Sequence, residues 1–296
     1  MVRRPRPARP PPRVPAAATR LGTHRAGHGR STGGAVSFSP DWLALREQAD
    51  ATARSTELLA PLGDFLDGAT ELTVRDLGCG TGSMGRWLSG RLPAPQRWIL
   101  HDHDPALLAQ ARLNLSARGP VLAVETREGD LTGLRAEDLT GTSLVTASAL
   151  LDLLTAEEVN RLAAACVHAG SPALLTLSVA GRVEMTPAEP LDTAFTAAFN
   201  AHQRRGLLLG PDAPAVTAAA FRALGASVHS APSPWRLGPR NAALTAEWLR
   251  GWVAAACEQD PGLTRHADAY LRRRSQDGVE IVVHHEDLLA LPGAAS

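Results

Sequence analysis

DLGCGTGSMG, residues 76–85, is the stretch that decides the fold of this chain. Its glycines at 80, 82 and 85 satisfy the pattern G-x-G-x-x-G, which occurs where a strand turns into a helix and the backbone comes close to a ligand. The residues before it, ELTVRD at 71–76, predict a strand, and those at 83–92 predict a helix. The stretch therefore predicts a ligand-binding turn at the carboxyl end of a strand.

Two carboxylates distinguish between the adenosine cofactors that such a turn can hold. Asp76 ends the first predicted strand, and Asp102 ends the next one, which covers 97–102. A carboxylate at the second place accepts hydrogen bonds from the ribose hydroxyls of any adenosine cofactor. A carboxylate at the first place would repel the pyrophosphate of a dinucleotide by about 3 kcal/mol per charge pair, at an effective dielectric of about 20. It would attract the ammonium and sulfonium of S-adenosylmethionine, so Asp76 favours that cofactor over NAD(P).

Four segments in order resemble one protein family. VRDLGCGTGSMGRWL resembles the first motif of class I S-adenosylmethionine-dependent methyltransferases, including its D-x-G-x-G-x-G core, and ILHDHDPALLAQAR is similar to the second. EGDL at 128–131 resembles the adenine-contacting segment, and SLVTASALLDLLT at 143–155 resembles the fourth motif, which borders the transferable methyl. The likeness extends over about residues 40–292 and does not name an acceptor.

The resemblance implies a set of cofactor-binding residues: Asp76, Gly78, Cys79, Gly80, Gly82, Asp102, His103, Asp130, Leu131 and Ala147. The glycines would let backbone N–H groups approach the methionine part of the cofactor, and Cys79 would be a small filler and not a nucleophile. Asp130 would lie near the exocyclic amine of adenine, with Leu131 packing beside it. Asp104 is an alternative ribose ligand, although its place before Pro105 suits a helix N-cap better.

The rest of the chain predicts a mixed α/β fold. Strands and helices alternate from residue 71 to 179, which indicates a parallel sheet with helices on both faces. A capping box from Thr155 to Glu158 opens a helix at 156–168. The resemblance implies a Rossmann-like seven-stranded sheet of order 3-2-1-4-5-7-6 with strand 7 antiparallel, which would include a last strand at 279–285.

Three parts follow along the chain. Residues 1–38 are rich in arginine and proline and predict a disordered tail. The methyltransferase domain is expected over 39–296, with a cofactor half at about 70–180. Acceptor-side helical insertions are expected at about 181–275, after a loop that begins with GRVEMTPAEP at 181–190. At the other end of the domain, a helix is expected from Pro40 to Leu59.

The charge distribution, the apolar stretches and the cysteines of the chain limit the kinds of partner and location that can be expected. The first 40 residues contain eight arginines and no acidic residue, so the remainder carries 22 arginines against 30 acidic residues. An acidic body argues against a nucleic-acid acceptor. No stretch has the roughly 18 apolar residues of a membrane helix or the apolar centre of a secretion signal, so a cytoplasmic protein is expected. The three cysteines lie far apart, and neither disulfides nor a metal site is indicated.

Five residues are candidates for the acceptor side: Asp152 and His202 as catalytic residues, and Asn200, Arg204 and Trp235 as substrate-binding residues. Asp152 stands among leucines, so burial could raise its pKa and make it a general base; it could equally begin the cap of the next helix. The polar residues at 200–204 could instead form a solvated helix face, and Trp235 could belong to the core.

The sequence thus predicts in-line methyl transfer from S-adenosylmethionine to an O, N, C or S atom of a small molecule, with no metal. The acceptor and the oligomeric state are left open. Alternatives are an RNA methyltransferase that uses the basic tail, a non-catalytic cofactor-binding protein, and an NAD(P)-dependent oxidoreductase.

Overall fold

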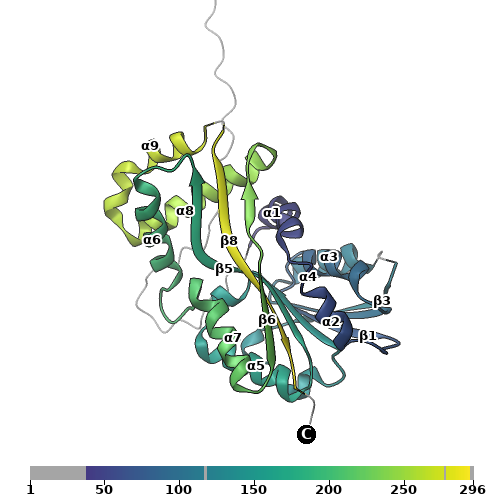
Figure 1. The fold of residues 1–296 in the computed structure, drawn as a ribbon. Coiled ribbons are helices and arrows are strands. Elements are labelled where there is room, and N and C mark those ends of the chain that lie inside the picture. Colours follow the sequence, from purple (N-terminus) through teal and green to yellow (C-terminus); the bar gives the residue numbers. More distant parts are fainter. Residues whose placement is uncertain (1–37, 117–118, 277, 294–296) are drawn as a thin grey trace, which may run out of the picture.

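The computed structural model describes residues 38–116, 119–276 and 278–293. Its described strands form one mixed sheet with the path β3-β2-β1-β4-β5-β8-β6, while β7 pairs with β8 beside that path (Figure 1). This confirms the predicted order, because β8 is the antiparallel seventh strand of the prediction. The tail predicted at 1–38 lies outside the described residues except for Phe38.

The first five strands run parallel to one another and place the glycine turn at the sheet's carboxyl edge. They are β3 (Val121–Glu128), β2 (Gln96–Asp102), β1 (Leu72–Leu77), β4 (Leu144–Ser148) and β5 (Ala173–Thr186). The chain leaves β1 toward β2 on one side and later returns to β4 on the other, so the strand order reverses beside β1. A crevice opens at the carboxyl edge of a parallel sheet at such a point, and ligands bind there.

Helices cover both faces of this sheet, as predicted. On one face, leucines of α2 (Leu59–Phe65), α3 (Ser83–Leu88) and α4 (Pro105–Ser116) belong to one buried cluster with Trp98 and Leu100 of β2. On the other, α5 (Ala156–His168) and α7 (Ala213–Ala223) pack on Leu77 and Leu175. The predicted bounds of α5 are confirmed: Thr155 Oγ1 accepts from Glu158 N at 3.2 Å.

A long two-stranded arm extends the sheet beyond its parallel part. β5 continues to Thr186 and pairs there with β8 (Glu280–Leu291), so the loop predicted at 181–190 is wrong in its first half. Gly181 and Pro187 read as loop signals, but Gly181 sits at an irregularity of the ladder with φ 68° and the strand resumes after it. β6 (Ser227–Pro232) and the unpredicted three-residue β7 (Trp235–Leu237) pair with β8.

A helical cap packs on this arm. It consists of α6 (Leu191–Gln203), α8 (Ala242–Gln259) and α9 (Thr264–Arg274), which lie within the insertion range predicted at 181–275. Its core is aromatic: Phe195 stacks on Tyr270 with ring centroids 4.3 Å apart, and Trp248 stacks on Trp252 at 5.3 Å. Among the described residues, none of the helices combines the length and apolar character that a membrane span requires.

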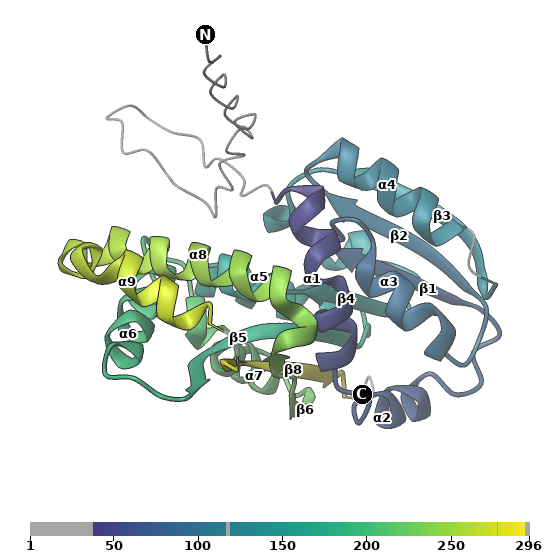
Figure 2. The same ribbon diagram turned by 90° about the horizontal axis from the view of Figure 1, so that it is seen from above.

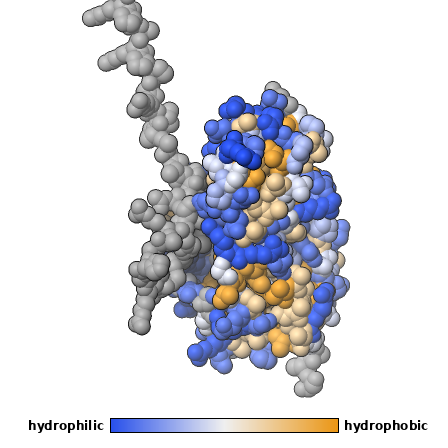
Figure 3. All heavy atoms as spheres, turned by 90° about the vertical axis from the view of Figure 1, so that its left-hand side faces the viewer, coloured by the Kyte–Doolittle hydropathy of each residue, from blue (hydrophilic) through white to orange (hydrophobic). Residues whose placement is uncertain are grey.

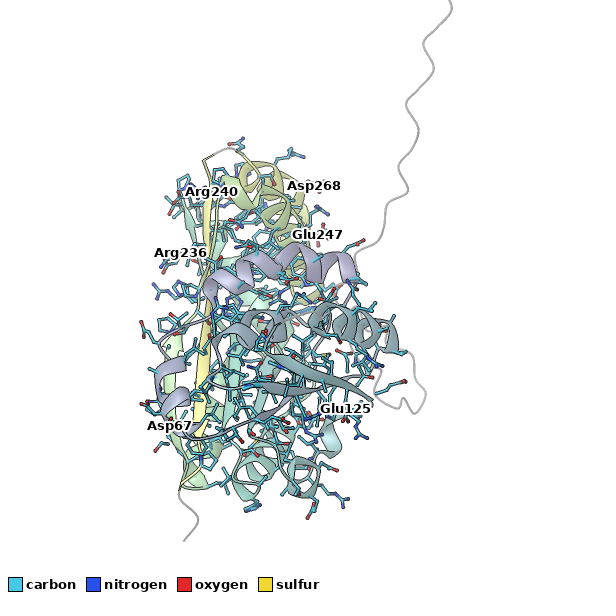
Figure 4. The ribbon with its side chains drawn as sticks, turned by 90° about the vertical axis from the view of Figure 1, so that its right-hand side faces the viewer. Asp67, Glu125, Arg236, Arg240, Glu247 and Asp268 are labelled. Carbon is cyan, nitrogen blue, oxygen red and sulfur yellow. The ribbon has the colours of Figure 1, made fainter. Side chains whose placement is uncertain are left out.

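Helix α1 (Pro40–Ala53) lies between the cap and the parallel strands (Figures 2 and 4). The prediction of one helix from Pro40 to Leu59 is wrong, because the chain leaves the helix at Arg54 and turns this side chain inward, where it is 3% exposed. Charged residues such as Asp67, Glu125 and Arg236 lie on the outside of the molecule (Figure 4).

Candidate functional site

The glycine turn between β1 and α3 is held by backbone conformations that other residues rarely adopt. Gly78, Gly80 and Gly82 all have positive φ, and a Cβ on Gly82 would lie 3.2 Å from that of Ala111. The turn can therefore pack closely against α4 only without a side chain. Cys79 is buried between these glycines, and burial raises the pKa of its thiol, so it stays protonated and acts as a filler.

Asp102 at the end of β2 organises the same turn. Its Oδ2 accepts a hydrogen bond from the N–H of Gly80 at 2.9 Å, and its Oδ1 accepts one from the N–H of Asp104 at 3.1 Å. The ring of His103 lies 3.4 Å from Oδ1. Each carboxylate oxygen has two lone pairs, so Asp102 retains capacity for ribose hydroxyls. Asp104 accepts from the N–H groups of Ala106 and Leu107, which is the N-cap arrangement that the sequence favoured.

Asp76 is buried at the centre of the carboxyl edge, 1% exposed. Its Oδ1 accepts a hydrogen bond from Thr146 Oγ1 at 2.7 Å, while its Oδ2 is buried with no hydrogen-bond partner. Burial raises the pKa of Asp76 to about 7, although Thr146 and Arg54 oppose this rise. A buried carboxylate oxygen without a partner is costly, and such atoms are expected where a ligand binds.

Arg54 is the second orphaned group at this edge. Its Nη2 donates to Ser83 Oγ at 3.1 Å and to Ser148 Oγ at 3.0 Å, whereas its Nε and Nη1 are buried without partners. Ser83 begins α3 and Ser148 ends β4, so the guanidinium lies between the glycine turn and the strand beside Asp76. The edge therefore offers a guanidinium in addition to the carboxylates of Asp76 and Asp102, on which the sequence reasoning was based.

Two residues next to this edge have strained backbones. Ala149, which follows β4, has φ 51°, and Leu177 in β5 has φ 58°. The N–H of Leu177 donates to the buried Asp287 Oδ1 at 2.7 Å, and Asp287 Oδ2 also accepts from Ser55 N at 2.8 Å. Positive φ without glycine costs about 1–3 kcal/mol and is concentrated at functional sites. Both strained residues line the cavity described next.

A cavity of about 600 Å³ opens between this edge, the β5–β8 arm and the cap. Of the residues that sequence analysis assigned to the acceptor side, four line it: Asp152, Asn200, His202 and Trp235. Residues as far apart in sequence as Trp42 and His285 complete its wall. We call this space the aromatic cavity, because six of its lining residues are aromatic: Phe38, Trp42, Phe199, Trp235, Trp248 and Trp252.

The polar candidates differ in their contacts. Burial raises the pKa of Asp152 to about 6, so it is still largely ionised at neutral pH. His202 Nε2 lies 3.1 Å from Glu258 Oε2, and Asn200 Nδ2 donates to the carbonyl of Gly181 at 2.6 Å. Burial lowers the pKa of His202 despite Glu258, which favours the neutral ring.

Arg204 does not line the aromatic cavity. Its guanidinium forms two hydrogen bonds to Asp212, at 2.5 and 2.7 Å. It is one residue beyond the end of α6, where the side chain turns to the surface. Arg204 therefore has a surface ion pair where the sequence predicted a substrate contact.

A second cavity, of about 410 Å³, adjoins the end of β3 and includes Asp130 and Leu131. Arg75 and His101 line it as well, with Arg75 Nη1 2.8 Å from His101 Nε2. Ala147 is buried in the core beside Leu77, with which it is paired in the sheet, so its side chain does not face either cavity.

Sequence reasoning missed Arg54, Arg46 and most of the aromatic wall. Every basic residue of the chain other than histidine is an arginine, so none stands out by type. The sequence feature that could have indicated the aromatic wall is the tryptophan content: six tryptophans in a chain in which only 4% of the residues are aromatic.

Comparisons with known proteins found one matching protein family and several distantly similar solved structures. Residues 74–172 match the family described as a methyltransferase domain; the matched range includes the glycine turn and ends before β5. No curated protein sequence gave a match. The solved structures similar to this chain include S-adenosylmethionine-dependent methyltransferases from Geobacter sulfurreducens and Thiobacillus denitrificans, both in complex with S-adenosyl-L-homocysteine.

These structural similarities are distant. The Geobacter protein has 19% identity and a TM-score of 0.45, with 86% of this chain and 99% of that chain covered. The Thiobacillus protein has 20% identity and a TM-score of 0.44, with 86% and 100% covered. The YcgJ protein from Bacillus subtilis has 14% identity and a TM-score of 0.48, with 81% and 100% covered.

Proposed function

We propose that this chain is a class I S-adenosylmethionine-dependent methyltransferase, as the match of residues 74–172 to a methyltransferase domain supports, and that it methylates a small molecule bound in the aromatic cavity. The observation that carries the proposal is the pair of orphaned groups, Asp76 and Arg54, at the carboxyl edge that opens toward that cavity.

The orphaned atoms fit the methionine part of the cofactor. That part is a zwitterion, with an α-ammonium that suits the unpaired Oδ2 of Asp76 and an α-carboxylate that suits the unpaired Nε and Nη1 of Arg54. A dinucleotide pyrophosphate would satisfy Arg54 but would leave Asp76 facing negative charge. The adenosine part would then be held by Asp102 at the ribose and by the second cavity, with Asp130 and Leu131, at the base.

The chemistry requires little more than alignment. When bound, the cofactor supplies an electrophilic methyl group, which an acceptor lone pair takes as the carbon–sulfur bond breaks and its electrons remain on sulfur. The walls of the aromatic cavity position the acceptor and exclude water, and such alignment supplies about 7–11 kcal/mol. The carboxylate of Asp152 takes the proton that an O–H or N–H acceptor releases. His202, paired with Glu258, is a second proton acceptor in the wall of the same cavity.

The position of the aromatic cavity supports a small acceptor over RNA, because the reacting atom must enter a space bounded on one side by the cap. The lining arginines are also paired with carboxylates, as Arg46 is with Asp50 at 2.9 Å. Nucleic acids need free cations along an open surface.

The test combines binding and transfer with the full chain. Isothermal titration calorimetry with S-adenosylhomocysteine and with NADH is expected to show binding of the first and not of the second. Incubation with methyl-labelled S-adenosylmethionine and a fractionated cell extract is expected to label the small-molecule fraction. Binding of NADH alone would refute the proposal, and so would label that enters only the RNA or protein fraction.

A further inference from the structure

The aromatic cavity has a composition that narrows the acceptor further, on the condition that it is the acceptor site of the proposed function. Six of the twelve aromatic residues of the chain line it. A volume of about 600 Å³ suits a molecule of one to three fused rings together with the reacting end of the cofactor.

The walls are flat and preformed. Trp248 and Trp252 stack with their planes 21° apart, and the guanidinium of Arg46 lies over the ring of Trp235, 5.0 Å from its centroid. Trp235 is fixed in turn by a hydrogen bond from Nε1 to Asp50 Oδ1 at 3.0 Å. Flat rigid walls favour a flat ring over a flexible chain, because offset or edge-to-face ring contacts stabilise the complex beyond the effect of burial and a rigid ligand loses less conformational entropy.

The lining charges leave no unpaired cation for an anionic acceptor. Within the described part of the chain, the three arginines of the wall each pair with a carboxylate: Arg46 with Asp50, Arg182 with Glu184, and Arg205 with Glu258. Of the lining histidines, His202 also faces Glu258, and burial lowers the pKa of His285 to about 3, which keeps its ring neutral. Asp152 adds negative charge. A phosphate or carboxylate would therefore enter without a compensating partner.

Uncharged polar atoms of the wall lack partners instead. Gln203 Oε1 and His285 Nδ1 are buried without a hydrogen bond, as are the indole N–H groups of Trp42 and Trp252. Such atoms destabilise the protein while they are unpaired, and a ligand that forms hydrogen bonds with them removes this penalty. Their neutral character suits hydroxyl and carbonyl groups. At the rim, Leu207 is 82% exposed, and hydrophobic side chains interrupt the hydrophilic surface on the face that carries α6 and α7 (Figure 3).

We propose that the acceptor is an uncharged ring compound that carries hydroxyl or carbonyl groups, stacked in the aromatic cavity with its nucleophilic atom toward Asp152. The rings contact the aromatic wall, the neutral polar atoms bind the ring substituents, and the paired charges exclude phosphorylated and carboxylated molecules.

Calorimetric titration of the full chain, with and without saturating S-adenosylhomocysteine, tests this with four matched probes. They are 2-naphthol, naphthalene, 2-naphthyl phosphate and 1-decanol. We expect 2-naphthol to bind at least tenfold more tightly than the phosphate or the alkyl alcohol, and more tightly than naphthalene. Phe199→Ala should weaken the binding of 2-naphthol at least fivefold. The ring of Phe199 is half-buried and lines the cavity, and its centroid lies 6.2 Å from that of Trp252.

Two further variants keep the test specific. Gln203→Leu should remove part of the advantage of 2-naphthol over naphthalene, since the leucine has a similar size and no oxygen. Phe65→Ala is the matched control, because Phe65 is an exposed ring on α2 outside the cavity lining, and it should change nothing.

Tighter binding of the phosphate or of decanol would overturn the inference, and so would equal effects of Phe199→Ala and Phe65→Ala. If S-adenosylhomocysteine binds but none of the probes does, the inference fails while the proposed function stands. If S-adenosylhomocysteine does not bind, the proposed function fails, and the titrations without it still decide which chemistry the cavity accepts.

Discussion

Replacing Asp76 by Asn should make the ligand-free protein more stable and the cofactor complex weaker. The pKa of Asp76 is raised from 3.8 to about 7 by burial, so the folded protein disfavours its ionised form. A carboxyl with a raised folded pKa loses stability as pH rises from its unfolded pKa to its folded one. The wild type therefore carries almost none of this cost below pH 3.8 and all of it above about pH 7.

The size of the effect follows from the same two values. A shift of about three units corresponds to about 4 kcal/mol at full ionisation, of which about 3 kcal/mol accumulates between pH 4.5 and pH 8. Asn is neutral at both pH values, and its oxygen can still accept from Thr146. The melting temperature of Asp76→Asn should therefore exceed that of the wild type by a margin that grows by roughly 6–12 °C over this range. Differential scanning calorimetry at both pH values measures this margin.

The binding half of the prediction has the opposite sign. Loss of a charged hydrogen-bond partner for the α-ammonium should weaken S-adenosylhomocysteine about tenfold to a hundredfold at pH 8. Asp102→Asn is the matched control, because both oxygens of Asp102 already accept backbone N–H groups. This control should lose stability at every pH instead of gaining it. The reasoning is refuted if the stability margin of Asp76→Asn does not vary with pH, or if this variant binds S-adenosylhomocysteine as tightly as the wild type.

Three other predictions follow from the site and its supports. Arg54→Gln should weaken the binding of S-adenosylhomocysteine at least tenfold in calorimetry and leave the affinity for 5′-methylthioadenosine unchanged. The reason is that 5′-methylthioadenosine lacks the carboxylate that is proposed to bind Nε and Nη1 of Arg54. Equal losses of affinity for both ligands would contradict this. Once an acceptor is known, initial rates of methyl transfer should rise about tenfold from pH 5 to a plateau above pH 7, since Asp152 acts as a base only when ionised and its pKa is about 6. Asp152→Asn should remove this rise. Thr155→Ala should lower the free energy of unfolding by about 0.5–2 kcal/mol in urea titrations through loss of the capping box of α5, with S-adenosylhomocysteine affinity unchanged.

The parallel half of the fold could be predicted because local sequence signals and tertiary structure agree there. The buried strand runs, the glycine turn and the capping box of α5 each specify the element that the structure contains. The family resemblance supplied the strand order. Around the arm the signals conflict: Gly181 and Pro187 read as a loop, yet pairing with β8 continues β5 to Thr186. Pairing with a strand almost a hundred residues later is not visible in a local pattern.

The candidate site was predictable to a similar extent. Asp76 and Asp102 could be placed at the carboxyl edge from the sequence, because each lies at the end of a predicted strand next to the glycine turn. Arg54 was not identified from the sequence, because its position depends on where α1 ends. The chain contains arginine and no lysine, so the residue type of Arg54 does not distinguish it from the other basic residues. Arg204 was predicted to contact the substrate, but it lies one residue beyond the end of α6. At that position its side chain pairs with Asp212 at the surface and does not face the cavity.

Helix α1 connects the proposed cofactor edge with the proposed acceptor cavity, although the family match ends before the cap. Its Leu43 covers the glycine turn, 3.2 Å from the position of a Cβ on Gly80, while Trp42 and Arg46 line the aromatic cavity. At its end the chain turns Arg54 inward beside Asp76. A shift of this one helix would change the walls of both sites at once. The segment at 40–54 thus joins the glycine turn to the aromatic cavity.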